Sequence, residues 1–594
     1  MVLVAFVGLF LFLLYQAWQT DYAKPPQLTS GLSTPETVTN ATANTGAAAS
    51  DVSTANPSQQ HLQVQTDLLA VNIALAGGEL RRVELKKYAA DKKNGADKID
   101  PDQKLALLDD SNGQLFTLQS GIAGSEQPLT SKESSFTASQ EAFALADGAA
   151  TLDVPLEYTD ASGYTVRKVF HFKRGSYEIG LTQTLLNHSG KVLQVTPYLR
   201  YQRMPPPEKA GPSFMRTAGT FAGIGIYLQD KSGGASYVYK KTAFKKLGTK
   251  GEDYELGQTF NWLGHEAISW VATNKNVASK PDENVEVSKQ TGGWIAMLQQ
   301  YFVVAIVPPQ DQIAHFSGDE NADSLQPYRA QYTGELVPVG DGAEHSFDTK
   351  LYIGPVSQGN TLEQVAPRFD LVQDYGILAP VAKPIFWVLS HYHTLTGNWG
   401  WSIILLTLTV KALFFKLSEA QYRSTAKMRK FSPRIKELRD RFGDDRERLN
   451  KAMMELYKKE GFNPLAGCWP LLVQMPVFFA LYWTLAQSVE LRQAPFVLWM
   501  QDLSGPDQYY VLPVLYGISM WVQQRMSGQS ATMDPTQAKM MNIMPIFLTG
   551  LFLFFPVGLV LYWLVSNLTN ILQQWVIARR LEAADLKKAE ASKK

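Results

Sequence analysis

The chain has 594 residues, with 56 Lys plus Arg against 55 Asp plus Glu, and 45% of its residues are hydrophobic. This balance excludes an intrinsically disordered protein and a simple nucleic-acid binder, so no DNA partner is expected. The single cysteine, Cys468, cannot form an intramolecular disulfide. Any exported part must therefore be stabilised by a hydrophobic core.

The N-terminus predicts a membrane anchor followed by a tether. Residues 1–18 carry no charge and would form a helix of about 27 Å, close to the hydrocarbon thickness of a bilayer. A basic start and a small-residue cleavage site are both missing, which favours an uncleaved anchor over a signal peptide. Residues 24–60 are rich in Pro, Thr, Ser, Ala, Asn and Gly and are predicted to be a flexible linker.

Residues 61–356 predict a large β domain. Short alternating runs, such as Tyr164–Phe172 and Tyr177–Leu185, are separated by turn residues, which is typical of strands. Few helical periods interrupt them, so we expect a β-sandwich rather than a parallel α/β sheet. The pair His265-Glu266 lacks the second histidine of a zinc-protease helix. Neither enzymatic activity nor a metal or other cofactor is expected.

The C-terminal third predicts five more spans, which makes the chain a multi-pass α-helical membrane protein of six spans. The spans are expected over about 397–417, 465–488, 508–525, 540–555 and 557–578. Residues 370–394 predict an amphipathic helix at the outer membrane interface. Residues 418–463 predict a cytoplasmic helical hairpin, in which Gly443 ends the first arm and Asp444 caps the second.

Basic residues predict the orientation. Residues 416–463 hold 14 Lys plus Arg and the tail after Ile577 holds six, whereas residues 488–508 hold only Arg492. The positive-inside rule places the hairpin and the basic tail, 581–594, in the cytoplasm. Six spans then put both termini inside and the β domain in the periplasm. The same charges predict either a docking surface for a ribosome or targeting factor, or a solvated face that only fixes topology.

Lys411 is a single cation inside an otherwise apolar span, where it costs about 2.5 to 3.5 kcal/mol. One interpretation is snorkelling to the inner interface. The other is a wet cavity that several spans share. Polar residues on the same and other spans favour the cavity, although each could instead bond a neighbouring helix. They are Thr407, Gln474, Gln487, Ser566, Asn567, Thr569, Asn570, Gln573 and Gln574.

Methionines are concentrated near the C-terminus, since eleven of the 15 follow residue 425. They include Met475 in the third span and Met544 in the fifth. Flexible methionine side chains can re-pack around varied apolar partners, but they also fill ordinary cores, and both interpretations stay open.

Several motifs in the C-terminal third match a known family. They are Gly397-Asn-Trp-Gly-Trp-Ser402, Glu419-Ala-Gln-Tyr422, Ala426-Lys-Met-Arg429, Gly443-Asp-Asp445, Asn463-Pro-Leu-Ala-Gly-Cys-Trp-Pro470, Gln474-Met-Pro476, Val489-Glu-Leu-Arg-Gln-Ala-Pro495, Gly558-Leu-Val-Leu-Tyr562 and Ser566-Asn567. With these motifs the chain resembles the YidC membrane-protein insertases of Gram-negative bacteria, relatives of the mitochondrial Oxa and chloroplast Alb proteins. The resemblance is dense over about residues 370–580. It implies a five-helix insertase core within 397–580 and a periplasmic β-supersandwich similar to galactose mutarotase.

The resemblance also implies a function and its residues. An insertase and foldase of this family moves nascent transmembrane segments into the inner membrane, alone or with the Sec translocon. Its implied partners are nascent clients, the Sec translocon, the ribosome and the lipid bilayer. Lys411 stands where the family has a groove arginine, and Thr407 matches a polar groove threonine of the family. The polar residues of the other spans add Gln474, Ser566 and Asn567 to the predicted groove.

The implied contacts with clients and with the ribosome lie elsewhere on the helices. The resemblance implies client contacts for Tyr562 and Trp563. The apolar side chains of Met475, Phe478 and Met544 are predicted to add to them, and the basic hairpin predicts contacts with a ribosome or targeting factor for Arg429, Lys430, Arg434 and Arg439. Two residues depart from the family. Lys411 keeps the charge of arginine but loses its planar donor fork, and Trp563 replaces a tyrosine hydroxyl with an indole.

Two other classes of function stay open. A polar-substrate transporter or channel would also place polar residues inside a membrane, although no convincing internal repeat accompanies them. An anchored periplasmic carbohydrate enzyme would use the β domain.

Overall fold

The computed structural model describes residues 61–591, except for 91–99, 101, 111–114, 126–127, 205–221, 230–236, 245–267, 270–290, 319–327, 358–361, 374, 376–377, 443–444, 460–468 and 528–534. The expected anchor and linker lie outside these residues. The chain divides into two compact units. One runs to Pro355 and includes Thr361–Val372, and the other contains Val356–Asn360 and Gln373–Lys594.

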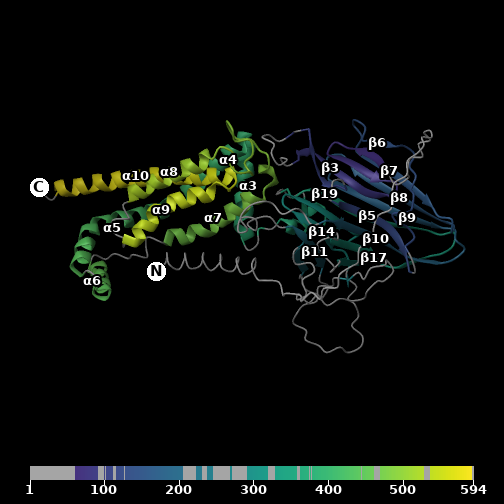
Figure 1. The fold of residues 1–594 in the computed structure, drawn as a ribbon, viewed down its shortest axis with the longest axis horizontal. Helices are drawn as coiled ribbons and strands as arrows, with labels where there is room; N and C mark the ends of the chain where they lie inside the picture. The colour runs from purple at the N-terminus through teal and green to yellow at the C-terminus, as the bar shows by residue number, and fades with distance from the viewer. Residues whose placement is uncertain are drawn as a thin grey trace, which may run out of the picture. The chain divides into compact units, whose positions relative to one another are not determined.

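The first unit contains two large, mainly antiparallel sheets (Figure 1). One sheet has eleven strands in the order β13-β16-β17-β10-β5-β3-β2-β1-β6, with β18 paired to β10 and β4 to β3. Its strands are β1 (His61–Gln65), β2 (Leu69–Ala74), β3 (Glu79–Ala89), β4 (Lys104–Leu108), β5 (Phe116–Gly124), β6 (Ala142–Ala144), β10 (Leu193–Arg203), β13 (Ile268–Ser269), β16 (Ala314–Gly318), β17 (Tyr328–Gly334) and β18 (Val337–Val339).

The other sheet has eight strands in the order β12-β11-β14-β15-β19-β9-β8-β7. Its strands are β7 (Thr151–Thr159), β8 (Tyr164–Lys173), β9 (Glu178–Asn187), β11 (Gly223–Gln229), β12 (Tyr237–Ala243), β14 (Trp294–Gln299), β15 (Phe302–Val307) and β19 (Glu344–Pro355). The expected runs Tyr164–Phe172 and Tyr177–Leu185 correspond to β8 and β9. Every second residue of β8 from Tyr164 to Phe172 is buried, as the period of a half-buried strand requires.

Buried hydrogen bonds join the two sheets face to face. The Tyr201 hydroxyl of β10 donates to Val304 O at 2.9 Å in β15 of the other sheet. Lys168 of β8 is fully buried, and its Nζ donates to Gly77 O and to Ser120 O, each at 2.6 Å. Burial lowers the pKa of Lys168 to about 7, although Glu79 nearby acts in the opposite direction. The unit is therefore a β-sandwich whose interior includes an ionisable side chain.

The second unit is helical (Figure 1). Its helices are α3 (Ala379–Thr396), α4 (Trp399–Leu413), α5 (Phe415–Phe442), α6 (Arg446–Lys459), α7 (Trp469–Gln487), the 3₁₀ turn η8 (Val489–Leu491), α8 (Val511–Ser527), α9 (Pro535–Phe552) and α10 (Val557–Ala591). Helix α10 contacts α4, α5, α7 and α8, while α3 contacts α4 and α7, and α8 contacts α9. Helix α10 therefore packs against four other helices of this unit.

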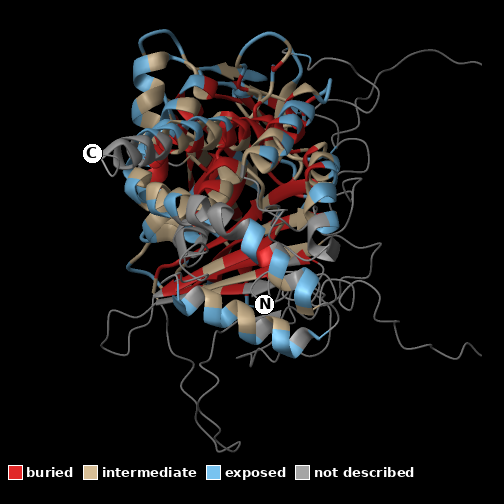
Figure 2. Ribbon diagram, turned by 90° about the vertical axis from the view of Figure 1, so that its left-hand side faces the viewer, coloured by how far each residue is buried: buried red, intermediate tan, exposed pale blue. Residues whose placement is uncertain are grey.

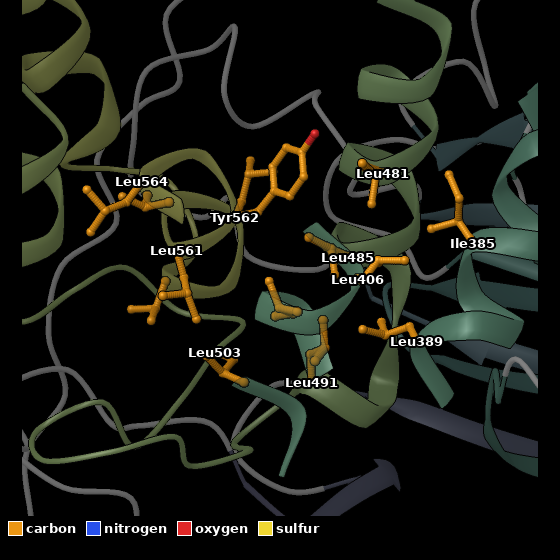
Figure 3. Packing of buried hydrophobic residues seen from close by; sticks show 14 of the residues in the cluster. Ile385, Leu389, Leu406, Leu481, Leu485, Leu491, Leu503, Leu561, Tyr562 and Leu564 are labelled. Carbon is orange, nitrogen blue, oxygen red and sulfur yellow. The ribbon is translucent and has the colours of Figure 1, made fainter. Parts of the chain in front are cut away.

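Buried apolar side chains hold the helices together (Figures 2 and 3). Leu389 of α3, Ile403 of α4 and Leu481 of α7 are each 0% exposed. Figure 3 shows part of this cluster, including Leu503 from the loop between α7 and α8 and Leu561 from α10. The cluster therefore draws on six helices, α3, α4, α7, α8, α9 and α10, and on the connecting loop.

The second expected span is not one straight helix. It breaks at Phe414, and α4 and the first part of α5 meet at a bend of 61°. By length and apolar composition, this bent pair qualifies as a candidate span, whereas no single helix in the described part of the chain does. The sequence between Trp401 and Ser432 has no Gly or Pro, so the usual signals of a break are missing there.

Two further details concern the segments that are predicted to lie in the cytoplasm. Asp445 caps α6, because its Oδ1 accepts a hydrogen bond from the Arg448 amide at 3.1 Å, whereas the predicted cap Asp444 lies outside the described residues. The tail does not begin a separate segment, since α10 continues without a break to Ala591. No Gly or Pro follows Gly558 in the sequence, so no strong helix stop signal is present.

Candidate functional site

Helix α4 carries Lys411 and is fixed at its N-terminus by Asn398. The Asn398 Oδ1 accepts hydrogen bonds from the amides of Gly400 at 2.9 Å and Trp401 at 3.3 Å, as a helix cap does. Two turns further on, Thr407 is 0% exposed and its hydroxyl donates to Ile403 O at 2.6 Å. The Thr407 hydroxyl is therefore hydrogen-bonded to a main-chain oxygen of α4 itself, one turn before Lys411.

Lys411 is held by a neutral residue of another helix. Its side chain is buried, with the residue 4% exposed, and its Nζ donates to Asn570 Oδ1 of α10 at 2.9 Å. Within the described residues, this is the one hydrogen-bond partner of the ammonium group, and no carboxylate pairs with it. The cation is thus bonded without being neutralised.

Glu419, the first acidic residue of the adjoining helix α5, does not supply that missing charge. Glu419 of α5 accepts hydrogen bonds from Arg423, at 2.7 Å from Nη2 and 3.1 Å from Nε. A carboxylate engaged by a guanidinium at i+4 is already paired. The polar site around Lys411 therefore carries a positive charge.

A second polar contact lies one turn earlier on α10. The Asn567 side-chain amide donates to Ser519 Oγ of α8 at 2.8 Å, and the Ser519 hydroxyl donates to Tyr516 O at 2.7 Å. Tyr422 of α5 donates to the main-chain oxygen of Asn570 at 3.4 Å. We call Lys411, Asn570, Asn567, Ser519 and Tyr422 the polar cluster. Side chains from four helices form it.

An aromatic cluster lies toward the N-terminal end of α10. Trp563 meets Phe478 of α7 at a ring-centroid distance of 4.7 Å, Phe552 of α9 at 5.1 Å and Tyr516 of α8 at 5.9 Å, all close to edge-to-face. Such pairs stabilise helix contacts beyond the area that they bury. The implied client-contacting residues Phe478 and Trp563 are thus brought together.

Two buried polar atoms on α10 lack a partner within the described residues. They are the indole Nε1 of Trp563 and the amide Oε1 of Gln573. Leaving a buried polar group unsatisfied costs about 1 to 3 kcal/mol. Both atoms lie on the helix that carries the polar cluster, so a polar ligand or water would find ready hydrogen-bonding groups on this helix.

The remaining residues that are predicted to line the groove or to contact clients differ in burial. Ser566 of α10 and Met544 of α9 are half-buried, whereas Tyr562 is 4% exposed and belongs to the apolar core. The side chains of Gln474 and Met475 lie outside the described part of the structure, although both positions are in α7. Contact of Tyr562 with a client stays a prediction.

The implied ribosome contacts lie on α5. Arg434 is exposed. The side chains of Arg429, Lys430 and Arg439 lie outside the described part of the structure, although their backbone belongs to the same helix. Contacts of these four residues with a ribosome stay a prediction.

Sequence reasoning did not single out three residues of the polar cluster. Asn570 stood among several polar residues of the last span, and neither Ser519 nor Tyr422 was assigned a role. Helical periodicity places Asn570 three residues after Asn567, on the same face of α10. That spacing predicts that both side chains lie on one face of α10, but it does not predict which helix packs against this face.

Two family models match consecutive parts of the chain. The family described as the YidC periplasmic domain matches residues 61–388, which contain the β-sandwich. The family described as the 60Kd inner membrane protein matches residues 391–584, which contain α4 to α9 and most of α10. The boundary between the two matches lies inside α3.

Relatives are similar along nearly the whole chain. The membrane protein insertase YidC of Methylococcus capsulatus is 40% identical over 576 residues, covering 96% of each chain. The membrane protein insertase YidC of Nitrosococcus oceani is 38% identical over 600 residues, covering 98% of each. Among solved structures, one titled as an active YidC insertase with the first transmembrane domain resolved has 18% identity and a TM-score of 0.35, covering 87% of this chain and 92% of that chain.

These matches define an inner-membrane protein with a periplasmic domain, which contains the β-sandwich. The chain belongs to the YidC family of membrane protein insertases. Its function is the insertion of membrane proteins, so its clients are membrane proteins and its working environment is the lipid bilayer.

Proposed function

We propose that the polar cluster is the place where insertion is assisted. A hydrophilic, often acidic, segment of a nascent client enters a hydrated groove beside Lys411 and is moved part-way across the bilayer. The groove shortens the apolar path, and the cation attracts negative client residues. The apolar client helix then leaves sideways along Phe478, Met544, Trp563 and the neighbouring methionine and aromatic side chains. No covalent chemistry is required.

The observation that carries this proposal is the pairing of Lys411 with a neutral amide. A lysine with a purely structural role would be expected to have a carboxylate beside it, because an uncompensated charge in an apolar environment is costly. Asn570 accepts one hydrogen bond from Lys411 and leaves the net charge in place. The partnerless Gln573 Oε1 and Trp563 Nε1, within the described residues, further support a hydrated route.

The proposal includes the topology and partners of the whole chain. Six spans with both termini in the cytoplasm would place α5, α6 and the tail on the side where clients are synthesised. The Sec translocon would share some of these clients. The 14 basic residues of 416–463 support a ribosome contact, since ribosomal RNA is a polyanion.

The test of the groove is reconstitution in liposomes with single-span clients that differ only in the charge of the translocated segment, scored by protease-protected fragments. Lys411→Arg should keep activity, because it retains the charge. Lys411→Ala should weaken insertion of the acidic client, and Lys411→Glu should weaken it further. Equal handling of acidic clients by the Glu variant and the parent would leave snorkelling as sufficient explanation of Lys411.

The ribosome contact has a separate test. Co-sedimentation with translating ribosomes should weaken steeply with salt, because each phosphate contact releases counterions. Neutralising Arg429, Lys430, Arg434 and Arg439 should reduce binding more than removing 581–594, whose basic residues are diluted by Glu and Asp. Unchanged binding in both variants, after orientation has been verified, would leave topology as the role of these charges.

A further inference from the structure

Helices α8 and α10 both carry an exposed apolar stripe that ends in a Trp–Arg pair. On α8 the exposed positions are Tyr510, just before the helix, then Val514, Ile518 and Trp521, followed by Arg525. On α10 they are Leu568, Leu572 and Trp575, followed by Arg579. The spacing of three and four residues puts each set on one face of its helix.

In both pairs the arginine lies over the tryptophan ring. The Arg525 Cζ is 5.0 Å from the Trp521 ring centroid, and the Arg579 Cζ is 4.1 Å from that of Trp575. Cation–π stacking of this kind fixes the guanidinium plane against the indole. Within the described residues, neither guanidinium has a hydrogen bond or an ion pair, so its N–H donors remain available to a ligand.

The two pairs lie toward the same end of the helical unit. Tyr516 of α8 contacts Trp563 of α10, and Ser519 contacts Asn567 further along both helices. Because both contacts advance together, α8 and α10 run parallel. At about 1.5 Å per residue, Arg579 lies about 9 Å beyond the level of Arg525, a separation that long arginine side chains can partly offset.

A ligand that fits each site must be apolar along its length and anionic at one end. The apolar stripes lie on helices within the family match to an inner membrane protein, so a lipid bilayer is the apolar surface that they would meet. A tryptophan at the end of such a stripe is typical of the membrane–water interface. The planar donor fork of arginine matches a phosphate group better than a single ammonium does.

We propose that the pairs Trp521–Arg525 and Trp575–Arg579 are two binding sites for the phosphate head group of anionic phospholipids. The acyl chains lie along the stripes of α8 and α10, and the head group meets the guanidinium at the end. The sites lie at the end of the bundle toward which α10 continues to Ala591. They thus fix the depth of the two helices that contribute Ser519, Asn567 and Asn570 to the polar cluster.

The test uses the full-length protein in vesicles of phosphatidylcholine with a minor fraction of phosphatidylglycerol. Either lipid is brominated on its acyl chains, so that it quenches nearby tryptophans. The contribution of Trp521 and Trp575 is the difference between the parent and a Trp521→Phe/Trp575→Phe variant. We expect brominated phosphatidylglycerol to quench this contribution more strongly than brominated phosphatidylcholine at the same fraction.

Arg525→Gln/Arg579→Gln should lower the preference for phosphatidylglycerol over phosphatidylcholine. The expected loss is about fivefold per site, if each surface cation contributes about 1 kcal/mol. Arg525→Lys/Arg579→Lys should retain part of it, because the charge stays and the stacked fork is lost. The matched control is Lys458→Gln/Lys459→Gln, which removes two exposed charges from α6 and should leave the preference unchanged.

Retention of the full preference in the glutamine variant would overturn the proposal, as would an equal loss in the α6 control. Absence of any preference in the parent would also overturn it and leave an acidic protein segment as the occupant. The emission spectrum and thermal midpoint of each variant in phosphatidylcholine alone check that the helices remain folded.

Discussion

Lys411 Nζ and Asn570 Oδ1 are 2.9 Å apart, which joins the C-terminal end of α4 to the middle of α10. The acceptor is an amide and not a carboxylate. Asn570 is also half-buried, and its main-chain oxygen accepts the Tyr422 hydroxyl. Asn570 therefore holds the Lys411 ammonium group in position by a hydrogen bond and leaves its positive charge in place.

The variant Asn570→Asp should neutralise the cation without moving it. We expect insertion of an acidic client to fall by about tenfold, equivalent to about 1.4 kcal/mol, because the client carboxylate would now compete with the introduced carboxylate for Lys411. A client without acidic residues should be affected less. The measurement is the ratio of protected fragments for the two clients in proteoliposomes.

Asn570→Leu is the matched control, since it removes the acceptor but adds no charge. It should keep the preference for acidic clients. If the aspartate and leucine variants lost both clients equally, Asn570 would be a packing residue of α10 and would have no part in charge selection.

Most of the β domain should be dispensable for the insertion step. The polar cluster and the Trp563 aromatic cluster are built from α4, α5, α7, α8, α9 and α10, all within the helical unit. A variant that lacks residues 62–356 but keeps the first predicted span and α3 should still insert a small client. Complete loss in a folded and correctly oriented variant would place an essential element in the β domain.

The β-sandwich should gain stability as pH rises above neutrality. Burial lowers the pKa of Lys168 from 10.5 to about 7, so between these values the unfolded chain binds a proton that the folded domain does not. Stability then increases with pH across that window. Burial raises the pKa of Glu79 above 4.5, and this shift gives the opposite slope as pH rises through the raised value.

Lys168→Met keeps a long side chain but removes the ionisable group. Chemical denaturation of residues 61–372 between about pH 7 and pH 9 should show a rising free energy of unfolding in the parent and a flatter curve in the variant. A flat parent curve would mean that Lys168 stays protonated inside the sandwich. Glu79→Gln separates the two contributions, because it should leave the rise above pH 7 in place.

The contact between α8 and α9 should tolerate no side chain at Gly517. A Cβ at this position would overlap the Thr549 hydroxyl, which donates to Pro545 O at 2.7 Å. Gly517→Ala should lower the stability of the helical unit by about 1 to 3 kcal/mol, as overpacked cores do. Adding Thr549→Ala should restore much of the loss in thermal midpoint, whereas Thr549→Ala alone should have a small effect. No rescue by the double variant would argue against this close approach.

The sequence predicted where a strand lies along the chain better than it predicted which strands are neighbours in a sheet. Alternation over Tyr164–Phe172 predicted β8 to within one residue, because one buried face imposes a period of two. Lys168 lies on the buried face of this strand, but its partner Ser120 belongs to the other sheet and Gly77 to the turn between two strands of that sheet. Strand order depends on contacts between distant residues, and a local pattern contains no record of them.

The candidate site shows the same limit. A cation in an apolar segment identified Lys411, because that signal is local. The three-residue spacing of Asn567 and Asn570 is a second local signal, which was not used. The bend at Phe414 has no Gly or Pro near it, so no local sequence signal predicts it. Tyr562 was assigned to client contact through family resemblance, whereas its side chain lies within the apolar core.

Helix α10 runs unbroken from Val557 to Ala591, a length of about 52 Å at about 1.5 Å per residue. It carries the Trp563 aromatic cluster, Asn570 and the start of the basic tail on one stiff rod. A rod transmits rotation and axial displacement, whereas a hinged tail would absorb them. A load on the last turns of α10 would therefore turn Asn570 relative to Lys411, and a partner that bound the tail would change the geometry around the cation.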